Sequence, residues 1–148
     1  MKQVLKKLTL IYYLIYIAAV LVALLGFQLH RSGVIIDSQS EAGIIISSVL
    51  IILIIGSIPI TLGVFNKRTK KWAVEEDVSK KLDLYSKASV IRLIIIGSGF
   101  LLGMLFFFLM NLQSMIFCAG ISAIALFFCK PTEAKIISEL QIEEENNE

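Results

Sequence analysis

The sequence is poor in the residues that most catalytic and metal sites require. Its 148 residues include one histidine and two cysteines. A hydrolase site within the membrane needs a Ser–His pair, paired aspartates or a His/Glu metal set, and a lone His30 supplies none of these. Cys118 and Cys129 lie on one predicted helix, about 16 Å apart along its axis, so they cannot form a disulfide with each other. Without a C-x-x-C motif, the chain does not fit a membrane thiol oxidoreductase.

Charge is missing from three long stretches. Residues 8–29, 42–66 and 93–129 contain no Asp, Glu, Lys, Arg or His. Ion-coupled and proton-coupled carriers usually hold an ionisable residue inside a span, and the small multidrug-type carriers depend on a membrane-embedded acid. The sequence therefore predicts no catalytic residue, no cofactor and no metal site, and the chain is not expected to be an enzyme.

Apolar residues fill these stretches. They make up 57% of the chain, whereas soluble domains contain about 45–50%, and the mean hydropathy is +0.83. A bilayer core of about 30 Å needs roughly 20 apolar residues in a helix. Leu8–Leu29 and Ala42–Phe65 each supply one span.

The third stretch is too long for one span, and it contains a polar cluster at residues 111–114. We interpret this cluster as a tight turn between spans at about 89–110 and 112–129, of which the last is the shortest. The predicted fold is an all-α membrane protein. Its four transmembrane helices form a bundle of two helical hairpins, and residues 1–148 make a single integral membrane domain. A connection at 66–88 and a tail at 130–148 lie outside the bilayer.

The basic residues predict the orientation. All but one of the 14 Lys and Arg residues lie on the side that holds both termini and the middle connection, and the exception is Arg31. The positive-inside rule places that side in the cytoplasm. The first apolar run is longer than a signal-peptide core and lacks an A-x-A site, so we expect an uncleaved first helix. The short external loops favour a bacterial cytoplasmic membrane.

A basic cluster follows the second span directly. Lys67, Arg68, Lys70 and Lys71 are expected to set topology and to attract anionic lipid headgroups. Arg92, just inside the third span, is expected to extend its guanidinium to the same headgroups. The cluster is short and adjoins the membrane, so nucleic-acid binding is not expected.

Small residues recur at a spacing of four, which brings two helix backbones close together in lipid. The third span carries Gly99 and Gly103, and the other spans carry Ala19 with Ala23, Gly43 with Ser47, and Ala119 with Ala123. The glycine pair faces either another helix of the same chain or a second copy. The preceding Gly97 does not complete a G-x-G-x-x-G dinucleotide motif with them. Pro59 predicts a kink in the second span.

Two segments outside the spans have helical apolar spacing. Residues 73–87 predict a surface helix that continues into the third span, with i,i+4 ion pairs Glu76–Lys80, Asp77–Lys81 and Asp83–Lys87. After Pro131, Ile136, Ile137 and Leu140 form a short apolar face that we expect to pack on the protein. The acidic end, residues 143–148, is predicted to be disordered.

Three functions remain open. The first is a non-catalytic accessory subunit or self-associating scaffold, as a homo-oligomer or with a partner membrane subunit. The second is a small oligomeric transporter or channel for an apolar or zwitterionic solute, supported by the kinked second span and by a partial polar stripe of Ser47, Ser48, Ser57 and Thr61. The third and weakest is a lipid-acting enzyme, which only polar residues at the two membrane faces can serve. On the external side these are Gln28, His30, Arg31, Asp37, Glu41, Asn111 and Gln113, which we interpret as a solvated loop region.

Overall fold

A computed structural model describes residues 2–37 and 39–140. These residues form five helices and no strand: α1 (Lys2–Arg31), α2 (Glu41–Trp72), α3 (Val78–Met110), α4 (Gln113–Phe128) and α5 (Glu133–Leu140). The all-α prediction is confirmed for this part of the chain. The predicted disorder at 143–148 lies outside the described residues.

Three of the helices, α1, α2 and α3, are long and apolar enough to cross a membrane. The 16 residues of α4 rise about 24 Å, less than the roughly 30 Å of a bilayer core. A fourth candidate exists only if α4 and α5, which are bent by 78° to each other, count as one broken span.

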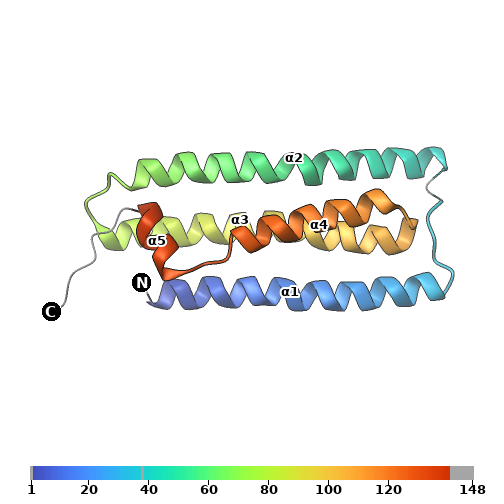
Figure 1. The fold of residues 1–148 in the computed structure, drawn as a ribbon, viewed down its shortest axis with the longest axis horizontal. Helices are drawn as coiled ribbons and strands as arrows, with labels where there is room; N and C mark the ends of the chain where they lie inside the picture. The colour runs from blue at the N-terminus through green and yellow to red at the C-terminus, as the bar shows by residue number, and fades with distance from the viewer. Residues whose placement is uncertain (1, 38, 141–148) are drawn as a thin grey trace.

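The helices lie in layers, with α2 on one side, α1 on the other, and α3 and α4 between them (Figure 1). In its most apolar 18-residue window, α3 buries 39% of its residues, against 17% for α1 and 22% for α2. The central helix is therefore α3. Because α3 and α4 separate α1 from α2, the predicted hairpin of the first two helices does not hold, whereas α3 and α4 pack as neighbours.

Local sequence explains where the helices end. After α1, Gly33 takes the left-handed conformation (φ 84°), and the amides of Gly33 and Val34 donate to the carbonyls of His30 and Leu29, which is a Schellman motif. At the start of α2, the Ser40 hydroxyl accepts a hydrogen bond from the Gly43 amide at 3.0 Å.

A turn is present within the predicted residues 111–114, but it is confined to residues 111–112. Asn111 ends α3 in the left-handed conformation (φ 48°, ψ 42°), which Asn tolerates better than most side chains, and α4 begins at Gln113. The loop after α1 is fixed to this turn, since the Ile36 amide donates to the Leu109 carbonyl and His30 Nδ1 donates to the Phe108 carbonyl at 3.2 Å. Among the polar residues predicted at this end, His30 is thus tied to the backbone of α3.

At the other end of the molecule, the start of α1, the end of α2, the start of α3 and α5 come together (Figure 1). We call this the basic end, because it gathers the basic residues that flank these helices. The surface helix predicted at 73–87 is present from Val78 onward, where it forms the start of α3 and continues into the third span, whereas residues 73–77 are not helical.

The ion pairs predicted in this segment need correction. Asp83–Lys87 is present at 3.0 Å, but Lys80 pairs with Glu75 at 3.3 Å instead of Glu76. Asp77 caps the start of α3 by accepting from the Ser79 amide, and Lys81 turns inward. The cause is the start of α3 at Val78, which leaves Asp77 outside the helix as its cap.

The amphipathic segment after Pro131 behaves as predicted. It forms α5, which lies across the basic end (Figure 1), and Ile136 and Leu140 are fully buried in the core. Residues 129–132 connect it to α4 without regular helix.

Candidate functional site: a cationic groove at the basic end

A row of buried polar side chains runs along one face of α3. Lys81, Tyr85, Ser89 and Arg92 recur at intervals of four, four and three residues and are all buried. Residues at this spacing lie one above the other on a helix. A polar row inside so apolar a chain is costly unless its members find partners, so each partner matters.

The first two members of the row hold α5. The Tyr85 hydroxyl donates to Glu139 Oε2 at 2.6 Å, and Lys81 Nζ donates to the Leu140 carbonyl at 3.4 Å. Because one bond involves a carboxylate and the other an ammonium group, both are charge-assisted. They join α5 to α3 at the basic end.

The partner of Arg92 is an aromatic ring. Only 5% of the residue is exposed, and its guanidinium carbon lies 3.7 Å from the centroid of the Phe65 ring of α2. A desolvated cation–π contact of this kind contributes about 2 kcal/mol. Within the described part of the chain, Arg92 Nε has no hydrogen-bond partner, and neither does the Ser89 hydroxyl. The row therefore ends in a buried cation with unused hydrogen-bonding capacity.

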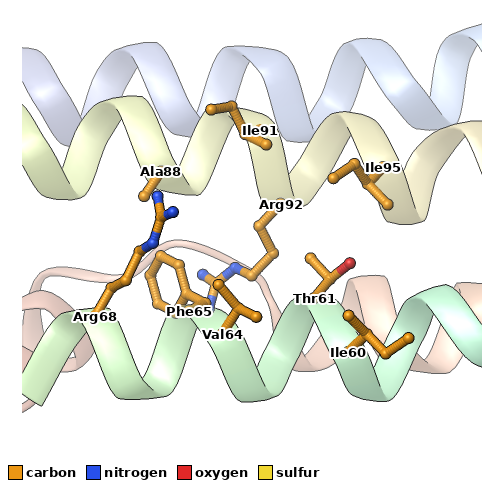
Figure 2. A pocket seen from close by; sticks show the side chains of 9 residues that line it. All are labelled: Ile60, Thr61, Val64, Phe65, Arg68, Ala88, Ile91, Arg92 and Ile95. Atoms are coloured by element: carbon orange, nitrogen blue, oxygen red, sulfur yellow. The ribbon is translucent and has the colours of Figure 1, made fainter.

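Arg92 also lines a groove of about 250 Å³ between α2 and α3 (Figure 2). Arg68 of α2 reaches into the same groove, so two guanidinium groups share it. The other walls are apolar apart from one threonine, and the complete lining is Ile60, Thr61, Val64, Phe65, Arg68, Ala88, Ile91, Arg92 and Ile95. The arrangement suits a ligand with an anionic group and an apolar part.

Of the residues predicted to contact headgroups, the structure brings Arg68 and Arg92 together. Lys67, Lys70 and Lys71 are exposed and are not among the residues of the groove. The extension of Arg92 to the headgroups stays a prediction, and the structure places its guanidinium against the Phe65 ring. The aromatic ring offers the guanidinium an electrostatic partner inside the protein.

The predicted small residues lie mostly at helix contacts within the chain. Gly103 faces α4 so closely that an added Cβ would lie 3.1 Å from the Ala119 amide nitrogen. Gly99 faces Ser122 and Ile54, and Ala123 is half-buried beside the core. Ala19 and Ala23 line a lateral groove of about 410 Å³ between α1 and α3.

The second span differs from the others in how its special residues are used. Gly43 accommodates the Asp37 carbonyl of the preceding loop, which an added Cβ would overlap, so its role lies in the turn before α2. At Pro59 the helix continues without interruption from Glu41 to Trp72, and the predicted kink there stays a prediction.

Sequence reasoning missed Phe65, Lys81, Tyr85 and Glu139 as members of the site. The available signal was the spacing of Lys81, Tyr85, Ser89 and Arg92, which forms a polar row on an otherwise apolar helix. Their partners lie on α2 and α5, far away in sequence, and nothing local points to them.

Comparisons with protein-family models, with curated proteins and with solved structures find no match for this chain.

Proposed function

We propose that this chain is a non-catalytic polytopic membrane protein that serves as an accessory subunit or self-associating scaffold in a membrane complex. In this proposal α1, α2, α3 and the bent pair α4–α5 are four spans in a bacterial cytoplasmic membrane. The basic end faces the cytoplasm, which the concentration of Lys and Arg there supports.

The lateral groove between α1 and α3 carries the proposal. Its nine lining residues include no charged side chain, and they are Tyr16, Ala19, Val20, Ala23, Leu24, Phe27, Phe100, Met104 and Phe108. Ala19 is buried at the floor of this groove, whereas Ala23 is partly exposed and is small enough to let a neighbouring backbone approach, and close packing drives helix association in lipid. The groove thus fits an apolar helix of a second copy or of a partner subunit.

The manner in which α1 is attached supports the same proposal. Its buried residues, Leu8, Tyr12, Ala19 and Gly26, form a single seam against α3. Much of the remaining circumference is exposed and apolar, including Leu14, Ile17 and Leu21. One helix of the protein therefore keeps a broad surface for lipid or for a neighbouring helix.

The test is the mass of the complex in nanodiscs prepared directly from the native membrane. We expect the wild type to exceed the 16.5 kDa of one chain. Ala23→Trp fills the groove and is expected to return the protein to a single chain, because the partner helix can no longer approach. Ile17→Trp, on the exposed face outside the groove, is the matched control and is expected to keep the complex. A wild type that is a single chain in its native membrane contradicts the proposal.

A transporter or channel is the second candidate, and one feature favours it. A groove of about 210 Å³ between α2 and α3 is lined in part by Ser57, Ser98 and Gly99, near the middle of two predicted spans. Both hydroxyls, however, donate to carbonyls of their own helices, at Ile54 and Ile95. Solute flux into liposomes that Ser98→Leu abolishes supports this candidate over the first.

A further inference from the structure

The groove of about 250 Å³ between α2 and α3 that Arg68 and Arg92 line carries positive charge without a matching negative charge. Two guanidinium groups, from Arg68 and Arg92, line it, and none of its nine lining residues is acidic. Glu139, the carboxylate that reaches the buried polar row, accepts its hydrogen bond from Tyr85. An anion seated between the two arginines would be paired with both cationic side chains.

The groove changes character along its length. Because α2 and α3 are antiparallel, Arg68 and Ala88 lie toward the basic end, while Ile60 and Ile95 lie toward the middle of the molecule (Figure 2). The helix rises about 12 Å over the eight steps from Ile60 to Arg68. Over this length, cationic walls give way to aliphatic side chains that are open on one side, namely Ile60, Val64, Ile91 and Ile95.

We propose that this groove is a specific site for one anionic phospholipid. The phosphate oxygens accept hydrogen bonds from the guanidinium groups of Arg68 and Arg92, and one acyl chain lies along Ile60, Val64, Ile91 and Ile95. This proposal rests on the membrane embedding described under the proposed function, because it requires the arginines to lie at headgroup depth.

The geometry distinguishes this site from a general attraction between basic residues and an anionic surface. Lys67, Lys70 and Lys71 are exposed outside the groove and would attract any anionic headgroup without selecting a whole lipid. Arg92, in contrast, is held in place by the Phe65 ring, so its planar fork is already oriented when the phosphate arrives. A free phosphate ion would leave the aliphatic walls unused, which is why we assign the site to a lipid.

The test is native mass spectrometry of the full chain released from bilayers of equal parts phosphatidylglycerol and phosphatidylethanolamine. We expect one phosphatidylglycerol to remain bound in preference to phosphatidylethanolamine, and inorganic phosphate not to displace it. Equal retention of the two lipids, or displacement by inorganic phosphate, overturns the proposal.

Three substitutions separate the groove from the surface charge. Arg68→Gln removes one phosphate contact at an exposed position, and we expect about a tenfold loss of retained phosphatidylglycerol. The neighbouring Lys67→Gln removes the same charge outside the groove, and we expect less than about a twofold loss. Arg92→Lys keeps the charge but loses the planar fork, and we expect a loss similar to that of Arg68→Gln.

Equal losses for Arg68→Gln and Lys67→Gln overturn the proposal, since they indicate a diffuse charge effect. Because Arg92 is buried, the helicity of its variant is compared with that of the wild type by circular dichroism, and Arg68→Gln decides the outcome if Arg92→Lys is misfolded. The membrane embedding is tested separately with Val34→Cys and Val74→Cys, which are 49% and 82% exposed at opposite ends. If an impermeant maleimide labels only Val34→Cys in intact cells, the proposed topology is supported. A lack of lipid selectivity in the same protein then contradicts the lipid site alone.

Discussion

The central helix makes two contrasting contacts. Against α4, Gly103 and Ala119 bring the two backbones almost into contact, and nothing larger than a methyl group lies between them. Against α2 at the basic end, Phe65 and Arg92 stand between the helices, and the groove beside them stays open.

The difference lies in what each contact leaves available. Small residues close a helix pair by backbone packing, which is the principal source of helix association in lipid. A large aromatic residue and an arginine hold two helices apart and leave a partly polar space. One helix therefore carries a structural contact toward its end and a candidate binding site toward its start.

The largest loss of stability is expected when Gly103, at the close contact between α3 and α4, is replaced by a larger residue. Gly103→Leu places a side chain where even a Cβ lies 3.1 Å from the Ala119 nitrogen, and overpacking of this kind destabilises by about 3 kcal/mol. The free energy of unfolding in mixed micelles measures the effect.

Gly63→Leu on α2 is the matched control, because an added Cβ there meets nothing within 4 Å. We expect its stability to equal or slightly exceed that of the wild type, since Leu favours helix more than Gly does. If Gly103→Leu and Gly63→Leu lower the free energy of unfolding equally, the prediction that α3 and α4 pack too closely for a side chain at residue 103 is wrong.

The α3–α4 arrangement was largely predictable from the sequence, for local reasons. A polar cluster interrupts one long apolar run, and its first residue, Asn111, suits the left-handed conformation that ends a helix. The two helices on either side of so short a turn must be neighbours, which brings the small residues of both into one contact.

The groove was not predictable in the same way. Arg92 has a partner on another helix, Phe65, and the inward turn of its side chain depends on a ring 27 positions away in the sequence. Lys81 meets Leu140, 59 residues farther along. The layered order also escaped prediction, because nothing in the loop at 32–40 indicates that α3 will lie between α1 and α2.

The second prediction concerns the polar row that continues from the groove to α5. Tyr85→Phe removes the donor to Glu139 and leaves a part-buried carboxylate without it, which costs about 2 kcal/mol. We expect hydrogen exchange to quicken at residues 133–140, because α5 opens locally more often. Tyr13→Phe, at an exposed tyrosine of α1, serves as the control and is expected to leave that exchange unchanged. Unaltered exchange in Tyr85→Phe would show that the apolar residues of α5 alone hold it in place.

The smallest loss of stability is expected for an exposed ion pair on the surface of the basic end. Asp83 and Lys87 form an ion pair at 3.0 Å, yet both side chains are exposed. Exposed i,i+4 pairs contribute about 0.3–0.5 kcal/mol, because solvent screens them and both side chains lose freedom. Asp83→Asn is therefore expected to lower the free energy of unfolding by no more than about 0.5 kcal/mol, as measured in the same micelles. Polar contacts on the buried face of α3 stabilise the structure, whereas those on its exposed face contribute little. A loss of stability in Asp83→Asn as large as that in Tyr85→Phe would contradict this difference.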